Sequence, residues 1–446
     1  TRRILDKEGI SYETSGSSDS IYIKSIAGDG EFDHGAKSGW MYLVNGVAVT
    51  RPAGQHILTG GETVQWRYTK NLGEDIGQDN SSWGGSGVDV TGKVGDDSSL
   101  TVNPQAKVTK GEAIAEIDKA QVESMLKQSQ EKNLTQLVIE PETKSSEAVE
   151  SMSVILEKAS AEKIAASEKA VLRIKTQLGD IVLANDVLRE LAGQKANTVT
   201  LTVKKNKKEG TDFEIRSGLN VLTDLTAGFT AVLPLDNETT DSTVAVQIMP
   251  DSSKKILMKS AADGKQIKAV LFGSATVTSM QNEKSFTDTD GHWGASAIEF
   301  ASARGILRGT AENQFSPDSE MNRAMLVTLL HRFDDERQSD GENYADVNPA
   351  AYYSHAAQWA KQNSIVPADE KNFNPGTKVT RQMLAEMIYS YALYSGEAAS
   401  SESAVDYCVN RGILVGKSEG SLNLEDTTTR AEVSAIIQRY VAQTLK

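Results

Sequence analysis

The pattern that most constrains this fold occurs three times in the last third of the chain. The triplet Phe286-Thr-Asp288 recurs as Tyr344-Ala-Asp346, and Arg323 recurs in a matching context as Arg381 and again as Arg430. A unit repeated in this way is a supersecondary element with one apolar face, and a single copy would leave that face in water. The copies must therefore pack against one another around a shared core.

Each copy is predicted to be two helices joined by a loop. In the first copy, a short helix is expected over residues 297–303, and it is followed by Gly305, where a left-handed residue favours the end of a helix. The second helix is expected to start at Asn322 and carries Leu329 and Phe333 on one apolar stripe. We predict an all-α, pseudo-threefold helix bundle, with its copies at residues 284–340, 341–397 and 398–446.

An arginine opens the second helix of every copy. The residue before it is a good N-cap each time, and Thr429-Arg430-Ala431-Glu432 is a complete capping box. A helix N-terminus offers unpaired N–H groups and a partial positive charge, and a guanidinium adds a fork that matches a carboxylate or phosphate. The three corners are therefore candidate anion-binding grooves. The alternative is that the arginines only cap helices or form ion pairs on the ring.

Further motifs accompany these arginines. They are His292-Trp293, Gly305-Ile306-Leu307, Phe315-x-Pro317 and the intact tetrapeptide Thr-Arg-Ala-Glu at 429–432. Together with the Phe-x-Asp triplet, they resemble the S-layer homology repeat, which usually occurs in three copies. Modules of that family attach exported proteins non-covalently to pyruvylated secondary polymers of the bacterial cell wall. The resemblance therefore implies an extracellular location, at the cell wall or S-layer surface of a bacterium.

The resemblance also implies a polymer-binding set, because the family's arginine contacts the acidic ketal. The implied residues are Arg323, Arg381, Arg430, Asp288, Asp346 and Trp293. The second copy has Pro367-Ala368 where the first has Arg308-Gly309, and the third lacks the Phe-x-Asp and Trp elements, so we expect one or more grooves not to bind. Large aromatic side chains are mostly buried, so Trp293 and Trp359 are expected in the core rather than on a ligand platform.

The first 78 residues are predicted to form a small α+β domain. Asn45-Gly46 stands between two apolar runs and predicts a hairpin over residues 39–49, and residues 63–68 alternate as a further strand. The segment resembles the small domain shared with the carboxyl-terminal part of transcobalamin-type vitamin carriers. The strands that lead into that domain are absent before Thr1, so a truncated chain is expected. The resemblance leaves open cobalamin binding by Trp40, Tyr42 and Trp66, although their alternation fits a hairpin core better.

Composition changes sharply after this domain. Residues 79–99 are rich in Gly, Ser and Asp, and a flexible linker is predicted over 79–110. A β-rich spacer domain is predicted over 111–283, with strands at 137–139, 171–175 and 198–203 and helices at 112–132 and 185–191. The chain as a whole is therefore predicted to be a multidomain α+β protein.

The charge balance excludes several partners. With 61 acidic and 47 basic side chains, the formal net charge is −14. Nucleic acids and anionic membranes are bound by Lys/Arg patches, so neither is an expected partner, and no apolar stretch is long enough to insert across a membrane. An acidic wall polymer fits this balance only if recognition is local, so wall binding is expected not to weaken steeply with salt.

No motif for catalysis or for a cofactor stands out. The single Cys408 is expected to be a small core residue, and the five His residues are scattered without metal-ligand spacing. Residues 87–94 fit a P-loop except at the last position, where Val94 replaces the Mg²⁺-binding hydroxyl, and residues 288–299 fail the calcium-loop pattern. We therefore expect no enzyme activity, no metal and no cofactor in this chain.

The sequence thus predicts a non-enzymatic bacterial surface protein. Its repeats would moor it to a pyruvylated wall polysaccharide, or to glycans associated with peptidoglycan, and its amino-terminal module would be displayed outward. Two alternatives stay open. One is the capture of cobalamin or another small ligand by residues 1–78. The other is a wall-anchored fragment of a surface enzyme whose catalytic domain lies before Thr1, because the chain starts without Met or a signal segment.

Overall fold

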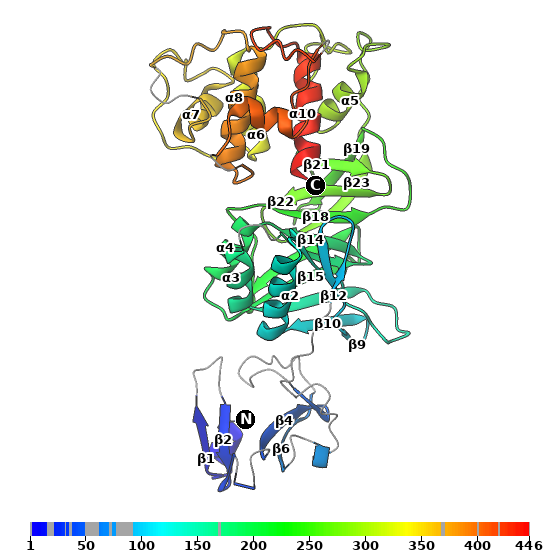
Figure 1. The fold of residues 1–446 in the computed structure, drawn as a ribbon, viewed down its shortest axis with the longest axis vertical. Coiled ribbons are helices and arrows are strands. Elements are labelled where there is room, and N and C mark those ends of the chain that lie inside the picture. Colours follow the sequence, from blue (N-terminus) through cyan, green and yellow to red (C-terminus); the bar gives the residue numbers. More distant parts are fainter. Residues whose placement is uncertain are drawn as a thin grey trace. The chain divides into compact units, whose positions relative to one another are not determined.

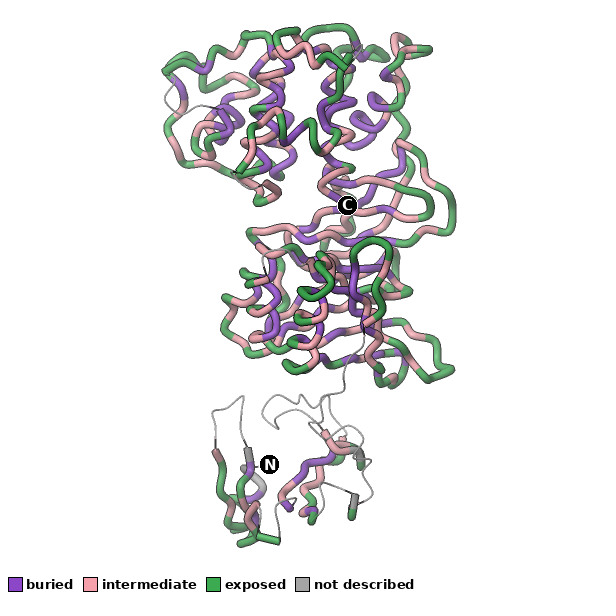
Figure 2. The backbone as a smooth tube through the Cα atoms, in the orientation of Figure 1, coloured by how far each residue is buried: buried purple, intermediate pink, exposed green. Residues whose placement is uncertain are grey.

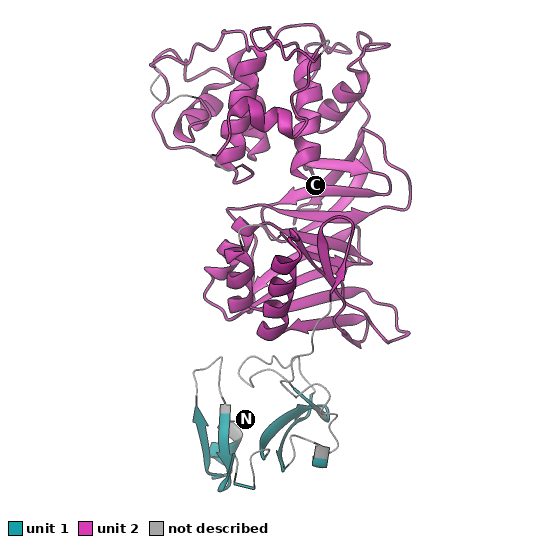
Figure 3. Ribbon diagram, in the orientation of Figure 1, with its two compact units in different colours: residues 1–88 teal, residues 89–446 magenta. Residues whose placement is uncertain are grey.

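The computed structural model divides the chain into two compact units, residues 1–88 and 89–446 (Figure 3). The residues that the structure describes are 2–15, 22–31, 33–34, 38–49, 62–70, 74–76, 92–167, 171–366, 371–398, 401–417 and 420–445. The multidomain α+β organisation predicted from the sequence is confirmed.

The first unit contains two small antiparallel sheets (Figure 1). The hairpin predicted at Asn45-Gly46 is confirmed, because both residues have positive φ, 52° and 83°, and join β4 to β5. The strand predicted at 63–68 is β6, which pairs with β4. The elements are α1 (Arg2–Lys7), β1 (Tyr12–Ser15), β2 (Tyr22–Ile26), β3 (Asp29–Gly30), β4 (Gly39–Val44), β5 (Val47–Ala48), β6 (Val64–Thr69) and a 3₁₀ turn at Glu74–Ile76.

The aromatic residues of β4 and β6 belong to the core of this unit. Trp40 and Trp66 pack against a cluster of Leu5, Ile23 and Ile26, and Tyr42 is buried opposite Trp66, with ring centroids 5.4 Å apart. These are the three residues that the sequence left open as a cobalamin surface. The hairpin-core interpretation of their alternation is confirmed, whereas ligand binding by them stays a prediction.

The larger unit begins with two sheets and three helices that share one apolar core. Figure 1 shows α2, α3 and α4 grouped along one side of the sheets. The eight-stranded sheet has the order β21-β22-β18-β14-β13-β11-β8-β7, and the nine-stranded sheet has the order β20-β19-β23-β16-β15-β12-β10-β9 with β17 beside β16. The strand bounds are β7 (Lys93–Val94), β8 (Ser99–Val102), β9 (Lys107–Thr109), β10 (Glu112–Ile117), β11 (Gln136–Ile139), β12 (Ser151–Glu157), β13 (Val171–Thr176), β14 (Gly179–Leu183), β15 (Thr198–Lys205), β16 (Thr211–Ser217), β17 (Asn220–Val221), β18 (Phe229–Pro234), β19 (Thr243–Ile248), β20 (Lys254–Ile256), β21 (Ser260–Asp263), β22 (Gln266–Leu271) and β23 (Ala275–Gln281).

Two sequence predictions for this region are wrong. The linker predicted over 79–110 ends by residue 92, because β7, β8 and β9 follow and β8 places Leu100 and Val102 in the core; residues 79–91 lie outside the described part of the chain. The helix predicted over 112–132 begins instead as strand β10 and becomes α2 (Lys119–Glu131) only after the capping box of Asp118. Alternate residues of β10 are buried, and alanines at two of these positions hid the period-two pattern.

The other elements predicted in the spacer are confirmed. The strands at 137–139, 171–175 and 198–203 are β11, β13 and β15, and the helix at 185–191 is α4 (Asn185–Ala192). A further helix, α3 (Lys158–Ala166), follows β12. The strand-rich character of the middle region is therefore as predicted, and its first strands lie earlier in the chain than residue 111.

Three helix pairs form the rest of the larger unit around one continuous core (Figure 2). The first helix of each copy packs against the second helix of another copy, α5 on α10, α7 on α6 and α9 on α8. Gly305 has φ of 70° after α5, as expected for a helix end, and Trp359 and Cys408 are fully buried core residues, as predicted. The helices are α5 (Ala295–Ala303), α6 (Arg323–Phe333), α7 (Ser354–Gln362), α8 (Arg381–Tyr394), α9 (Ala404–Asn410) and α10 (Arg430–Thr444).

A buried arginine joins these helices to the sheets. Arg304, only 1% exposed, follows α5 and donates hydrogen bonds to the carbonyl oxygens of Ser260 (2.6 Å), Asp241 (2.8 Å) and Thr243 (2.8 Å). A guanidinium out of water is stable only when its N–H groups find acceptors, and here the sheet region supplies them.

A buried ion pair makes a second connection between helices and sheets. The Nζ of Lys259, just before β21, lies 2.8 Å from Oε1 of Glu397, which follows α8. The other carboxylate oxygen of Glu397 accepts hydrogen bonds from the hydroxyls of Tyr440 (2.5 Å) and Thr444 (3.1 Å) in α10. The sheet region thus supports the second and third copies as well as the first.

Candidate functional site

The chain segments that lead into the three second helices are hydrogen-bonded in a closed ring. Met321 N–H donates to the carbonyl of Thr428 (2.9 Å), Thr428 N–H donates to Val379 (2.8 Å), and Val379 N–H donates to Met321 (3.0 Å). Every copy thus gives one bond and receives one. The starts of α6, α8 and α10, where the candidate arginines stand, are fixed around this ring.

The N-caps at these helix starts are as predicted. Asn322, Thr380 and Thr429 each accept a hydrogen bond from the N–H three residues later, and Thr429 with Glu432 forms the full capping box. The arginine that follows each cap is the first helical residue in all three copies.

The backbone of these helix starts is not available to a ligand, contrary to the sequence expectation. In α10, the N–H groups of Arg430 and Ala431 donate to the carbonyls of Ser319 and Pro317 in the first copy, both at 2.9 Å. The same pairing recurs around the ring, because Arg323 and Ala324 donate to Thr377 and Pro375, and Arg381 and Gln382 donate to Asp426 and Leu424. The prediction of unpaired N–H groups was wrong because a loop of the neighbouring copy uses them.

The arginine side chains staple neighbouring copies together. Arg430, 5% exposed, donates from Nε to the carbonyl of Phe315 (2.9 Å) and from Nη2 to that of Arg308 (2.6 Å). Arg381 is also buried and donates in the same way to Leu422 (2.7 Å) and Val415 (2.5 Å). In the part of the chain that the structure describes, the side chains of Arg430 and Arg381 therefore neither cap a helix nor form an ion pair, which was the alternative left by the sequence, but bond to the backbone of another copy. Among the described residues, no acceptor is hydrogen-bonded to Nη1 of Arg430, so this nitrogen remains for a further partner.

The two candidate aspartates hold the loops that the arginines reach. The carboxylate of Asp288 accepts hydrogen bonds from the N–H of Phe315 (2.9 Å) and Ser316 (2.7 Å), and Asp346 accepts from Phe373 and Asn374, both at 2.7 Å. These backbone bonds, that from Phe315 first, lower the pKa of Asp288, and the positive charge of Arg430 lowers it further. Asp288 is therefore anionic at neutral pH.

The structure shows which copy supplies each member of a corner. Asp288 and Arg430 meet at Phe315, whose N–H binds the first and whose carbonyl binds the second. Arg323 lies over the ring of Phe373, 5.3 Å from its centroid, beside the loop that Asp346 holds. Each aspartate thus shares its loop with an arginine from a different copy. Arg381 meets a loop of the third copy, which has no such aspartate.

Trp293 lies on the surface, and the expectation that it belongs to the core was wrong. Its side chain is 65% exposed, two residues before α5 begins. Gly294, next to it, lies so close to α10 that a Cβ there would be 3.2 Å from that of Ala431. The backbone therefore approaches the Arg430 corner while the indole faces solvent, which an isolated sequence cannot show.

Tyr352 is the residue that sequence reasoning missed. It is 67% exposed and stands two residues before α7, as Trp293 does before α5. A comparison of the positions just before each first helix would have found it. The corresponding place before α9 is Glu402, so the third copy has no aromatic side chain there.

Further arginines raise the local positive charge at the helical copies. Burial lowers the pKa of Arg439 in α10, and the charge of Arg381 lowers it further. Burial likewise lowers the pKa of Arg332 in α6, with the charge of Arg308 as the next cause. Arg332 also lies 3.8 Å from the carboxylate of Glu336, which offsets part of this positive charge.

The described residues contain no group of three or more His, Cys, Asp or Glu side chains arranged to hold a metal ion. Within the same residues, no helix is both long and apolar enough to cross a membrane.

Two family descriptions match parts of the chain. The S-layer homology domain matches residues 285–324 and 343–382, which are the first two copies up to the starts of their second helices. A domain of unknown function, DUF4430, matches residues 3–70. The S-layer homology repeats identified from the sequence are therefore confirmed for two copies, and the third copy lies outside the matched residues.

Several bacterial proteins are similar to part of the chain. An amylopullulanase of Thermoanaerobacterium thermosulfurigenes is 27% identical over 35% of this chain and 9% of its own length, and the exoglucanase XynX of Acetivibrio thermocellus is 25% identical over 35% and 16%. An endo-1,4-beta-xylanase A of Thermoanaerobacterium saccharolyticum is 30% identical over 23% of this chain and 9% of its own length. The chain thus spans less than a fifth of the length of these relatives.

Proposed function

We propose that this chain, whose S-layer homology repeats place it at a bacterial cell surface, is held non-covalently to an acidic polysaccharide of the cell wall. The three helix pairs would act as one pseudo-threefold ring with a groove at each corner. The chain itself would be a non-enzymatic anchor that needs no cofactor, and peptidoglycan-associated glycans would be secondary partners.

The observation that carries this proposal is the composition of two corners. The first contains Arg430 and Asp288, and the exposed Trp293 precedes Gly294, which approaches α10. The second contains Arg323 and Asp346, and the exposed Tyr352 packs on Tyr353, whose ring lies against that of Phe373. An exposed ring beside a cation and an oriented carboxylate offers a flat apolar face, a partner for an acid and an acceptor for hydroxyls. These are the groups that an acidic sugar presents.

The proposed ligand is a pyruvylated sugar, whose ketal carries a carboxylate. Nη1 of Arg430 would pair with that carboxylate at the first corner, since Nε and Nη2 are already bonded to carbonyls. At the third corner Arg381 is bonded to two carbonyls of the third copy, but the described residues there include neither a loop-holding aspartate nor an exposed ring. We therefore propose two binding grooves and one structural corner.

Sedimentation with purified cell-wall sacculi tests the proposal. The full chain is expected to pellet with native sacculi and to stay in the supernatant when the secondary polymer has been removed or its pyruvyl groups have been cleaved. Pelleting that does not depend on the pyruvyl groups would contradict the proposed ligand. No pelleting at all would contradict wall attachment.

A second candidate is that the chain is the anchoring part of a larger surface enzyme. It is favoured by the similarity to the amylopullulanase, exoglucanase and xylanase, of which the chain spans 9–16%. The sequence that precedes Thr1 in the gene tests it. An adjoining glycoside hydrolase domain would support this candidate, and its absence would contradict it.

A further inference from the structure

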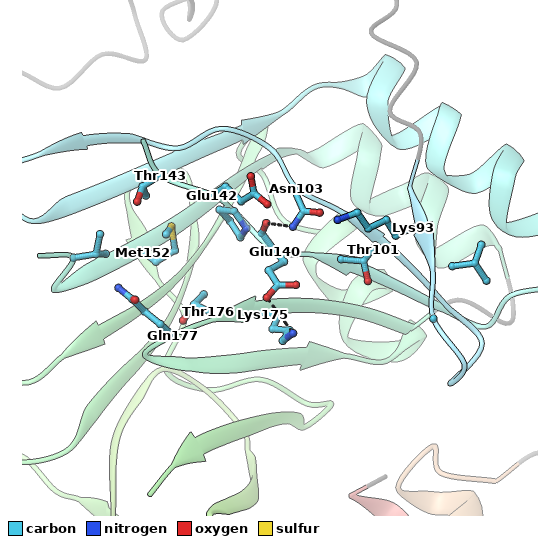
Figure 4. Close-up of a pocket in the computed structure, with 14 residues that line it drawn as sticks. Lys93, Thr101, Asn103, Glu140, Glu142, Thr143, Met152, Lys175, Thr176 and Gln177 are labelled. Carbon is cyan, nitrogen blue, oxygen red and sulfur yellow. Dashed lines mark hydrogen bonds and ion pairs between the residues drawn. The ribbon is translucent and has the colours of Figure 1, made fainter. Parts of the chain in front are cut away.

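A pocket of about 570 Å³ opens in the sheet region, where three parallel strands end (Figure 4). β8, β11 and β13 run parallel in the eight-stranded sheet, and Asn103, Glu140 and Thr176 stand at or just after their carboxyl ends. Met152 of β12, in the nine-stranded sheet, also lines the pocket. Ligands of open α/β sheets bind outside such strand ends, and the volume is within the range of small-ligand sites.

Part of the pocket wall is fixed by bonds within the chain. Asn103 donates from Nδ2 to the carbonyl of Glu140 (3.0 Å), and the Glu140 carboxylate lies 3.0 Å from Nζ of Lys175. The hydroxyl of Thr176 donates to Gly179 (2.6 Å), and its N–H donates to the carboxylate of Asp180 (3.1 Å). These groups need no ligand to hold their positions, so the site is preorganised.

Two charged side chains that line the pocket, Lys93 and Glu142, are not held in this way. Within the described part of the chain, Lys93 has no ion-pair partner, and the carboxylate of Glu142 makes only a long contact, 3.5 Å, with the amide of Gln105. In the view of Figure 4, Asn103 lies between Glu142 and Lys93. An ammonium and a carboxylate without charged partners therefore line the same pocket on either side of a fixed amide.

We propose that this pocket binds a short peptide that carries both an ammonium and a carboxylate group. Lys93 would pair with the carboxylate of the peptide and Glu142 with its ammonium. The hydroxyl of Thr101 and the amide of Gln177 line the pocket within reach of peptide amides, and Met152 offers an apolar contact for a side chain. This inference does not rest on wall attachment, because the pocket lies in the sheets and not in the helical copies.

The lining chemistry disfavours other ligand classes. The fourteen lining residues include no aromatic side chain, so the flat apolar face on which a sugar ring stacks is absent. Two lysines and two glutamates line the pocket, so its net charge is zero, and a nucleotide or other polyanion would meet as many carboxylates as ammonium groups. A zwitterion satisfies both signs at once.

Calorimetric titration of the full chain with unblocked trialanine tests this proposal. We expect a dissociation constant below about 1 mM. Trialanine that is acetylated at its amino end and amidated at its carboxyl end should not bind, because it lacks both charges. Lys93→Gln and Glu142→Gln should each weaken binding about tenfold, since each removes one charge-assisted bond.

Matched controls separate recognition from general charge effects. Lys107→Gln and Glu147→Gln remove the same charges at exposed positions outside the pocket and should leave binding unchanged. All four positions are exposed, so each variant should keep the thermal midpoint of the unaltered chain. An absence of heat with trialanine, equal binding of the blocked peptide, or binding that Lys93→Gln and Glu142→Gln do not weaken would each overturn the proposal. Binding of N,N′-diacetylchitobiose in place of trialanine would overturn the peptide class.

Discussion

Two kinds of side chain in the helical copies differ in burial. We call the contacts between neighbouring copies seams and the exposed edges of the proposed grooves rims. At the seams, Arg430 and Arg381 are buried and bonded to carbonyls of the next copy. At the rims, Trp293 and Tyr352 keep 65% and 67% of their surface exposed. The seam residues hold the ring together whatever it binds. The rim residues contribute little to folding, so they report on binding.

The three corners repeat this contrast within one ring. All of them have an N-cap and an arginine at the first helical position, but among the described residues an aspartate-held loop and an exposed aromatic residue occur together at two of them. The features common to all corners serve assembly. Those confined to two corners are where ligand recognition is proposed.

The largest loss of stability is expected when the buried ion pair between sheets and helices is broken. Glu397→Gln should lower the free energy of unfolding by about 3–5 kcal/mol, because it leaves Lys259 buried without its counter-charge. Urea denaturation measures this. Glu209→Gln, which breaks the exposed pair with Lys254, is the control and should cost at most about 1 kcal/mol.

The lowered pKa of Glu397 predicts how the stability of the fold changes with pH. Burial raises the pKa of Glu397, but the charge of Lys259 and the hydrogen bonds to the carboxylate outweigh it and hold the pKa below its ordinary value of 4.5. A lowered pKa stabilises the folded state above pH 4.5, and this stabilisation is lost as pH falls below it. The Gln variant should lose less stability than the unaltered chain on acidification. An equal loss would show that Glu397 does not contribute.

The second-largest loss of stability is expected when the buried arginines between copies, Arg381 and Arg430, are replaced. Arg381→Ala and Arg430→Ala should each cost about 2–4 kcal/mol of unfolding free energy, because each leaves two carbonyls of another copy without a donor. Arg189→Ala, at an exposed position, is the control and should change stability by less than about 0.5 kcal/mol. If Arg381→Ala leaves the unfolding free energy unchanged, then Arg381 does not hold the second and third copies together.

The rim variants should change binding and not stability. Trp293→Ala and Tyr352→Ala should each weaken retention on sacculi about tenfold while unfolding free energies stay within about 0.5 kcal/mol of the unaltered chain. Leu219→Ala, at a similarly exposed apolar position in the sheet region, should affect neither. If both rim variants sediment like the unaltered chain, the exposed rings do not contact the polymer.

Salt should have the smallest effect. Recognition by one arginine at each groove works against a net charge of −14, so screening weakens attraction and repulsion together. We expect retention on sacculi to change less than about threefold between 50 and 500 mM NaCl, or to increase. A steep loss of retention would indicate an extended basic surface instead of a local contact.

The local parts of the ring could be predicted from the sequence because their causes are local. N-caps at Asn322, Thr380 and Thr429 and the helix end at Gly305 depend on residues within one turn. The carbonyl partners of Arg430 and Arg381 could not be predicted, because they depend on which copy packs beside which. The exposure of Trp293 depends on the close approach of Gly294 to α10, which is also a tertiary contact.

In the sheet region, too, the sequence predicted some strands and missed others. β11 and β13 carry short apolar runs and β15 alternates Thr with buried Val or Leu, so these strands were recognised. β8 is four residues long and follows a Gly/Ser/Asp-rich stretch that concealed it. β10 was taken for a helix because two of its three buried positions are alanine. Small or short buried patterns are weak in the sequence and become strands only through their neighbours.

A calorimetric titration of the full chain with a purified pyruvylated fragment of the wall polymer tests wall attachment most directly. Two equivalents of fragment per chain are expected to bind, one should be lost in Trp293→Ala and the other in Tyr352→Ala, and removal of the pyruvyl groups should abolish both. No binding, three equal sites, or binding that survives removal of the pyruvyl groups would contradict the assignment of two grooves and one structural corner.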